Sequence, residues 1–175
     1  VFFLCAGLGV TFAIFFFHLQ IVARDLVSPV LNILSYLFFV LASTIMFTSL
    51  FVQTGPASGG WTVYPPLSAL GDASSGAKIG MDLWLVSMAM FIVSSLLGGL
   101  NYITTILNMR TKGMSMTRLP LPIWALFFTA VLGVLSFPVL LSGALLLLFD
   151  RNLGTSFFLS DIFFAVKILP NEGGM

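Results

Sequence analysis

The sequence predicts an all-α membrane protein, a polytopic bundle of four transmembrane helices in a single membrane domain over residues 1–175. Of its 175 residues, 59% are hydrophobic and only 7% are charged, whereas soluble domains carry about 25% charged residues. Long charge-free stretches alternate with short segments that hold the Asp, Glu, Lys and Arg residues. Since about 20 apolar residues of helix cross a hydrocarbon core, each of these stretches is long enough to span a membrane.

The charge-free stretches place the spans in order. No charge precedes Arg24, and the following gaps lie between Asp25 and Asp72, Asp82 and Arg110, and Arg118 and Asp150. We therefore predict transmembrane helices at about residues 1–22, 30–53, 80–109 and 120–149. After them, "SFFLSDIFFAVKIL" is apolar but contains two charges and is too short to cross, so residues 155–169 are expected to lie at the membrane interface.

Prolines mark three positions in these helices. Pro29 and Pro120 fall where a helix begins, where the missing N–H costs nothing. Pro138 falls within the last span and is expected to kink it, with Ser136 and Ser142 available to bond the freed carbonyls.

Composition also restricts the function. The net charge of +1 offers no basic surface for nucleic acid, so partners are expected within the lipid bilayer. Cys5 and His18 are the only residues of their types, so no His-based metal site can be completed and no Cys/His or Ser/His/Asp constellation exists. We interpret His18 as an interfacial residue and Cys5 as a packing residue.

Orientation follows from the distribution of Lys and Arg. Two short loops carry Arg24, Arg110, Lys112 and Arg118, while Lys78, Arg151 and Lys167 share the other side with five acids. The first side is predicted to be cytoplasmic, or the matrix side in a mitochondrion.

The third span carries a polar seam on one predicted helix face. Its members follow one another by 7, 4, 3, 4 and 3 residues and are Ser87, Ser94, Gly98, Asn101, Thr105 and Asn108. The spacing alone favours a helix–helix contact, because small-xxx-small pairs such as Ser94 with Gly98 let backbones approach. A path for water or protons is the alternative interpretation, and one seam can serve both purposes.

The second span begins "DLVSPVLNILSY", with Asp25 just outside the membrane and Asn32 and Ser35 one turn apart. An acid at a membrane entrance next to a row of Asn and Ser is how a proton path would be built. A loop carboxylate beside Arg24 is the alternative, and from the residues alone it is favoured.

The segment "GWTVYPPLSAL" between the second and third spans contains Trp61, Tyr64, Pro65 and Pro66. Trp and Tyr anchor membrane interfaces, and consecutive prolines hold a chain extended. This rigid segment is predicted on the outer face.

Three ordered motifs carry a family resemblance. "GWTVYPPLS", then "SSLLGGLNYITTILNMR", then "LPLPIWALFFTAVLGVLSFPVLLSGALLLLFDRNLGTSFF" resemble subunit I of the haem–copper oxidases, the family that includes the catalytic subunit of cytochrome c oxidase. The resemblance covers at least residues 12–158.

The resemblance implies reduction of oxygen to water at a haem–copper centre, coupled to proton uptake and pumping. It aligns the four spans with helices 2 to 5 of a twelve-helix subunit, so the chain is expected to be an internal fragment, inactive alone. The haem and copper ligands would lie outside it, leaving no catalytic residue and no metal ligand within it. Implied partners are the remaining helices of subunit I, oxidase subunits II and III, and cytochrome c or quinol as electron donor. The expected location is a bacterial inner membrane, with the mitochondrial inner membrane as alternative.

The resemblance also assigns roles to residues and changes the preference at the seam. The acid that matches Asp25 opens the family's D proton pathway, and the residues that line it match Asn32, Ser35, Ser94, Ser95 and Asn101. The segment with Trp61, Tyr64, Pro65 and Pro66 resembles the part that covers the haem propionates. With the resemblance, the proton path is favoured over the plain loop carboxylate.

The chain departs from the family pattern at four positions. Ile14 stands where the family has an Asn, and His18 where it has a Pro. The pattern F-P-R-x-N-N is reduced to "SPVLNI", with Val30 in place of the Arg and Ile33 in place of one Asn. These changes bear on whether proton pumping is intact.

Two other functions remain as alternatives. A quinol oxidase or nitric oxide reductase of the same superfamily would share much of the pattern, although "WTVYPPL" favours the oxygen-reducing branch. A non-enzymatic helical fragment of a membrane transporter would be expected to show inverted repeats or broken helices, and only Pro138 offers a break.

Overall fold

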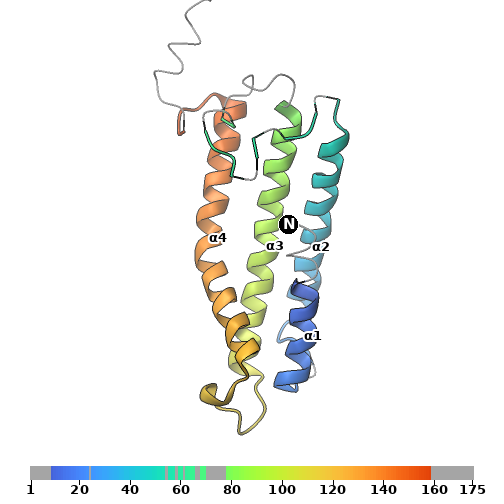
Figure 1. Cartoon of the computed structure of the whole chain (residues 1–175), viewed down its shortest axis with the longest axis vertical. Coiled ribbons are helices and arrows are strands. Elements are labelled where there is room, and N and C mark those ends of the chain that lie inside the picture. Colours follow the sequence, from blue (N-terminus) through green and yellow to red (C-terminus); the bar gives the residue numbers. More distant parts are fainter. Residues whose placement is uncertain are drawn as a thin grey trace, which may run out of the picture. The chain divides into compact units, whose positions relative to one another are not determined.

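The computed structural model describes residues 9–158 except for residues 24, 54, 58, 61, 66–67 and 70–77. Within these residues the chain is helical, which confirms the predicted all-α class. The elements, shown in Figure 1, are α1 (Gly9–Ile21), α2 (Pro29–Thr48), the 3₁₀ helix η2 (Ser49–Phe51), α3 (Lys78–Asn108), the 3₁₀ helix η3 (Met116–Arg118) and α4 (Leu121–Leu153).

Three of the predicted membrane spans are confirmed as helices. The segments 29–51, 79–108 and 121–153 are long and apolar enough to cross a membrane. As described, α1 has 13 residues, and the eight residues before it lie outside the described part, so the first span stays a prediction. The helix α4 ends at Leu153, four residues later than expected, and its last turns include Asp150, which accepts the amide of Phe158, and Arg151, which donates to the carbonyl of Ser68.

The prolines occupy the expected positions. Pro29 is the first residue of α2, and Pro120 directly precedes α4. The helix α4 continues through Pro138. The expected role of Ser142 is wrong: its hydroxyl donates to the carbonyl of Val139 at 2.7 Å, whereas a proline frees the carbonyl four residues before it.

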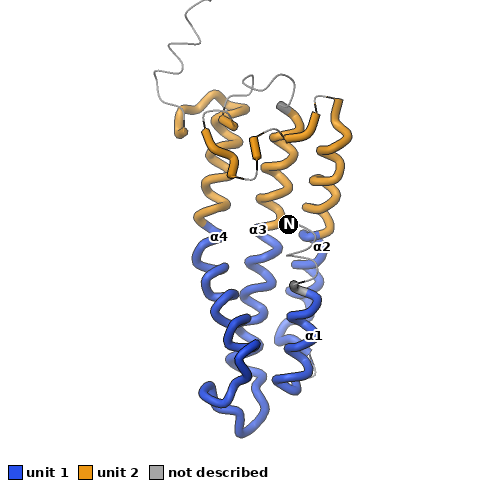
Figure 2. The backbone as a smooth tube through the Cα atoms, in the orientation of Figure 1, with its two compact units in different colours: residues 1–39, 92–138 blue, residues 40–91, 139–175 orange. Residues whose placement is uncertain are grey.

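The chain divides into two compact units, drawn in different colours in Figure 2. Unit 1 comprises residues 1–39 and 92–138, and unit 2 comprises residues 40–91 and 139–175. The prediction of a single membrane domain over residues 1–175 stays a prediction.

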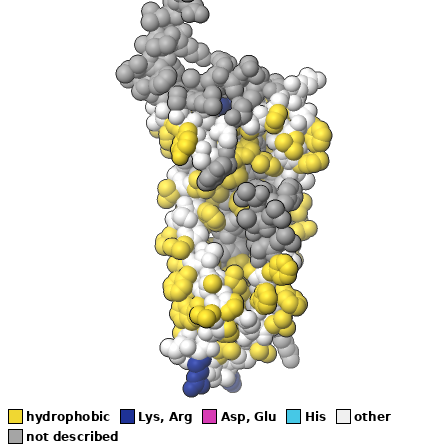
Figure 3. Space-filling view, in the orientation of Figure 1, with side chains coloured by type: hydrophobic (Ala, Val, Ile, Leu, Met, Phe, Trp, Pro, Cys, Tyr) yellow, Lys and Arg dark blue, Asp and Glu magenta, His cyan; other side chains and the backbone are white. Residues whose placement is uncertain are grey.

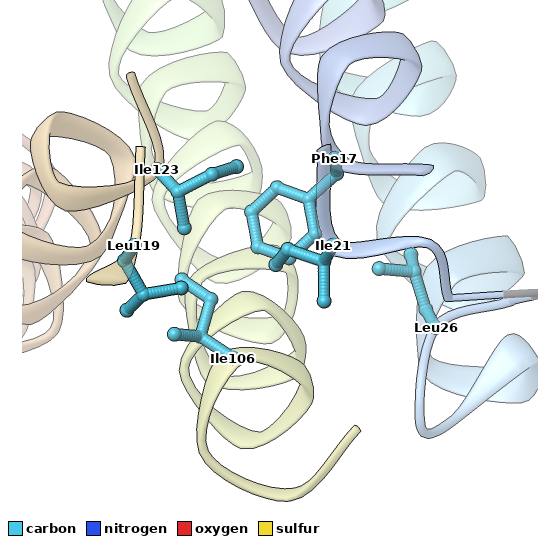
Figure 4. Close-up of a cluster of buried hydrophobic side chains, with 6 residues drawn as sticks. All are labelled: Phe17, Ile21, Leu26, Ile106, Leu119 and Ile123. Carbon is cyan, nitrogen blue, oxygen red and sulfur yellow. The ribbon is translucent and has the colours of Figure 1, made fainter. Parts of the chain in front are cut away.

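The core of unit 1 joins three helices and two loops. Its side chains are at most 7% exposed and are Phe17, Ile21, Leu26, Ile106, Leu119 and Ile123 (Figure 4). The ring of Phe17 also lies 5.3 Å from that of Tyr102, measured between ring centroids. The cluster thus fixes α1 and the loops before α2 and α4 against the end of α3.

The core of unit 2 lies where α3 begins and α4 ends. Ala69, Met81, Leu85 and Leu147 form it, with Val63 and Trp84 among the partly buried residues packed against it. Gly80, in the first turn of α3, lies against the backbone carbonyl of Gly55 so closely that a Cβ atom would overlap it.

Beyond α4, the chain folds back on a buried carboxylate. Asp150 accepts hydrogen bonds from the Thr155 hydroxyl at 2.5 Å and from the amides of Phe157 and Phe158 at 3.1 and 2.7 Å. These residues begin the predicted interfacial segment 155–169, of which residues 159–169 lie outside the described part.

Large apolar side chains remain exposed along the helices. Val30, Leu121, Leu135 and Val139 are between 69% and 84% exposed. On the face shown in Figure 3, hydrophobic side chains are spread over the helices instead of forming one patch. Such surfaces require an apolar surrounding, as expected for helices of a membrane protein.

The glycines of unit 2 provide a matched test of packing. We expect Gly80→Ala to lower the free energy of unfolding by about 1–3 kcal/mol, because the added methyl group would overlap the backbone of Gly55 and force it to shift. A Cβ atom added at Gly143 would have no other heavy atom within 4 Å, so Gly143→Ala should be neutral or slightly stabilising. Unfolding of the full-length protein in detergent measures both, and equal effects would contradict the close approach.

Candidate functional site

The polar seam of α3 holds the chain segment that enters α2. The Asn101 side chain, 1% exposed, brackets the backbone of Ser28: Oδ1 accepts from the Ser28 amide at 3.2 Å and Nδ2 donates to the Ser28 carbonyl at 2.9 Å. The Ser28 hydroxyl in turn accepts the amide of Leu31 at 3.3 Å, which caps α2. Asn101 therefore fixes the point where α2 begins.

Thr105 extends this contact by one residue. Its hydroxyl oxygen accepts the amide of Val27 at 3.1 Å, and its hydroxyl proton is donated to the carbonyl of Asn101 at 2.6 Å. Thr105 is fully buried. One turn of α3 thus binds two consecutive backbone amides of the segment that follows Asp25.

Further along unit 1, two serines bind each other's backbone. Ser94 Oγ donates to the Ser35 carbonyl at 2.6 Å, and Ser35 Oγ donates to the Ser94 carbonyl at 3.0 Å. The two hydroxyl oxygens lie 3.5 Å apart. Gly98 permits this approach, since a Cβ atom there would lie 3.3 Å from Ser35 Oγ.

The same register recurs in unit 2. There the buried hydroxyl of Ser87 donates to the carbonyl of Ala42 at 2.7 Å. Each step of seven residues forward along α2, from 28 to 35 to 42, matches a step of seven backward along α3, from 101 to 94 to 87. A seven-residue repeat is close to two helical turns, so it keeps contacts on one face of each helix. The helix–helix contact predicted from the spacing of the seam is confirmed.

The predicted pathway residues do not all join this seam. Asn32 lies four residues after Ser28 and three before Ser35, so it shares their face of α2 and is half-buried. Ser95 is half-buried and shares a helix face with Gly99, where an added Cβ atom would lie 3.4 Å from Val134 of α4. The spacing therefore places Ser95 on the face of α3 where Gly99 approaches α4, whereas Ser94 binds Ser35 of α2.

Asp25 lies at the exposed end of the seam. Its side chain accepts a hydrogen bond from the amide of Leu26 at 2.8 Å, and the residue is exposed. The contacts of Asn101 and Thr105 follow within three residues of it. Asp25 is thus exposed two and three residues before the backbone groups that Thr105 and Asn101 bind, whereas Asn101 and Ser94 are buried.

The outer loop is only partly within the described residues. Trp61 and Pro66 lie outside them, while Tyr64 is 73% exposed and Pro65 is exposed. Ser68 is buried and closes a turn, with its amide donating to the Tyr64 carbonyl at 3.3 Å.

Sequence reasoning did not assign the partners of the seam. The residue type at position 28 does not reveal that its backbone will be a hydrogen-bond partner, although a serine before a proline is a recognisable start of a helix. Arg151 Nε also donates to Asp82 Oδ1 at 2.6 Å, a contact that the sequence did not predict. Its only signal was that both charges stand near predicted helix ends.

The described residues do not fit a haem–copper centre. No group of three or more His, Cys, Asp or Glu residues is placed to hold a metal ion within the described part of the chain. His18 contacts its own helix, with Nδ1 2.7 Å from the carbonyl of Ile14.

Comparison with known proteins gives relatives that are subunits of haem–copper oxidases. A family model described as "Cytochrome C and Quinol oxidase polypeptide I" matches residues 1–169. The chain is 43% identical to the alternative cytochrome c oxidase subunit 1 of Bradyrhizobium diazoefficiens, over 89% of this chain and 26% of that protein. It is 42% identical to the heme-copper oxidase subunit I+III of Aeropyrum pernix, over 81% of this chain and 17% of that protein. It is 43% identical to cytochrome c oxidase subunit 1 of Candida albicans, over 85% and 27%.

The chain spans about a quarter of the length of the cytochrome c oxidase subunits it matches. The family match nevertheless covers all of the described helices. This chain therefore belongs to the cytochrome c and quinol oxidase polypeptide I family, subunit I of the haem–copper oxidases.

Proposed function

We propose that the chain is part of the catalytic subunit of a cytochrome c oxidase, which reduces oxygen to water and couples this reaction to proton uptake and pumping. Family membership and the names of the relatives support this proposal. Since the chain spans about a quarter of those relatives, the activity belongs to the whole subunit, and we expect this part alone to be inactive. A quinol oxidase is the second candidate, because the family description names both electron donors.

Within that subunit, this part would take up protons. Asp25 would receive them from the aqueous side, and the residues that line the path would be Asn101, Asn32, Ser35 and Ser94, with Ser95 next to Ser94 on α3. The observation that carries the proposal is the continuous contact between α2 and α3. An exposed carboxylate stands at one end, followed by Asn101 at Ser28 and then by the pair of serines.

The hydrogen bonds suggest how these residues divide the work. The side-chain amide of Asn101 uses one oxygen lone pair and one N–H to bind the backbone of Ser28. Its second lone pair and its second N–H can therefore bind water. The hydroxyl protons of Ser35 and Ser94 are engaged with carbonyl groups, so their oxygens would act as acceptors. In this proposal the hydrogen bonds of the seam keep α2 and α3 at a constant separation beside the path. Asp25 and Asn32 contribute the groups nearest to solvent.

Two of the departures from the family pattern lie away from the seam. Val30 and Ile33 are 72% and 61% exposed, so they stand on the face of α2 opposite its contact with α3. The replacement of polar side chains there would leave the seam intact. Ile14, in α1, is half-buried and is the departure that would remove a polar group from the protein interior.

The cofactors and partner subunits of the oxidase would be held by parts of the protein beyond the described residues. Haem and copper would be held by other parts of the subunit, and oxidase subunits II and III, with cytochrome c or quinol, would be the partners. The described spans would correspond to helices among the second to fifth of twelve, in a bacterial or mitochondrial inner membrane. The segment with Tyr64 and Pro65, together with Trp61 and Pro66 outside the described residues, would cover the haem propionates.

The entrance of the path can be tested at Asp25. In the complete enzyme, we expect Asp25→Asn to slow proton uptake and turnover about tenfold or more, because positioned proton-transfer groups contribute about 100-fold or more. Asp25→Glu keeps a carboxylate and should retain most of the activity. Stopped-flow proton uptake and oxygen consumption measure both variants. Unchanged proton uptake in Asp25→Asn would rule out this entrance.

The role of Asn101 can be tested by stability and proton uptake together. Asn101→Ala leaves the amide of the half-buried Ser28 without its partner and leaves the Ser28 carbonyl with the amide of Asn32 at 3.3 Å. We therefore expect the free energy of unfolding to fall by about 1–3 kcal/mol. Proton uptake should slow as well. Asn152→Ala is the matched control, because that exposed amide donates to the carbonyl of Leu148 in its own helix at 3.2 Å and should change stability by less than about 0.5 kcal/mol when removed. A stability loss with normal proton uptake would leave Asn101 a purely structural residue.

A further inference from the structure

The buried cation of unit 2 connects three segments that are distant in sequence. Arg151 stands in the last turn of α4, and its side chain is 1% exposed. Its Nε donates to Asp82 Oδ1 of α3 at 2.6 Å, and its Nη1 donates to the backbone carbonyl of Ser68 at 2.6 Å. Two different nitrogens of one guanidinium therefore bind the carboxylate of Asp82 on α3 and the carbonyl of Ser68 in the loop before it.

The bound loop has an unfavourable backbone conformation. Val63 has a φ of 52°, in the left-handed region that β-branched residues rarely adopt. Its carbonyl accepts the Ser68 hydroxyl at 2.8 Å, and the Ser68 amide donates to the carbonyl of Tyr64 at 3.3 Å. Such conformations persist only where the surroundings over-determine them. Ser68 supplies the local bonds, and Arg151 binds Ser68.

Stability alone is a weak reason for a charge in this position. Desolvation of a buried ion pair often cancels its attraction, and apolar residues of similar volume are commonly as stable. An apolar pair could not bind the Ser68 carbonyl, however, and a lysine lacks the planar fork that serves two acceptors at fixed angles. The charge pair is therefore suited to fixing the loop conformation more than to adding stability.

We infer that Arg151, oriented by Asp82, is a positioning residue. By binding the Ser68 carbonyl it holds Ser68 where its hydroxyl and amide bond the backbone of Val63 and Tyr64, and so it maintains the strained conformation of Val63 and the backbone position of the exposed Tyr64. This inference rests on the proposed function only for the importance of the loop at the outer face. The contacts that carry it lie wholly within unit 2.

Arg151 and Asp82 can be tested by deleting both charges in the full-length subunit within the assembled oxidase. The double variant Arg151→Met with Asp82→Leu removes the cation without leaving an unpaired charge, so we expect the unfolding temperature to stay near that of the wild type. Amide hydrogen exchange over residues 62–69 should nevertheless rise about tenfold or more, as loss of a charge-assisted hydrogen bond implies. Exchange over residues 97–108 serves as the internal control and should not change.

The conservative variant Arg151→Lys keeps the inference testable if the double variant does not fold. It retains a cation beside Asp82, and we expect the same rise in loop exchange, whereas the exposed Arg118→Lys in the loop before α4 should change neither region. Wild-type exchange over residues 62–69 in Arg151→Lys or in the double variant would overturn the inference. Oxygen consumption by the wild-type complex tests the proposed function separately, since the exchange measurement does not depend on it.

Discussion

The contact between α2 and α3 is set by one constraint: a polar group between apolar helices must find its partner in the protein. Asn101 and Ser94 of α3 meet this constraint by binding backbone groups of α2 instead of other side-chain ends. Every residue of a helix has a backbone carbonyl that could accept such a bond. The positions of the polar side chains along α3 therefore fix the register of α2 against α3. The steps of seven residues in each helix follow from this arrangement.

The polar seam and the pair of Arg151 with Asp82 use different chemistry. In unit 1 the seam consists of neutral amides and hydroxyls, which cost little to bury once they are bonded. In unit 2 a full charge is buried, and Arg151 is accompanied by Asp82 and by a loop carbonyl. Neutral groups are suited to a contact that water could enter, whereas a paired charge is suited to fixing a loop in one conformation.

In the proposed proton path, helix contact and proton transfer are compatible uses of the same residues. The hydrogen bonds of Asn101 and of the serine pair keep the two helices at a fixed separation, and each group retains unused capacity for water. The segment after Asp25 is bound by Asn101 and Thr105. A carboxylate attached to a rigid segment keeps a constant distance to the next group, which proton transfer requires.

The sequence by itself determined the helical class, three of the spans and the polar face of α3, because hydropathy and the helical period are properties of consecutive residues. Only the tertiary structure decided that Asn101 binds the backbone of Ser28, that Gly99 approaches Val134 of α4 and that Arg151 reaches Asp82 across 69 residues of sequence. Backbone acceptors leave no mark in residue identity, and the partner of a side chain depends on how helices pack. The motifs identified the family, while packing alone assigned each polar group its partner.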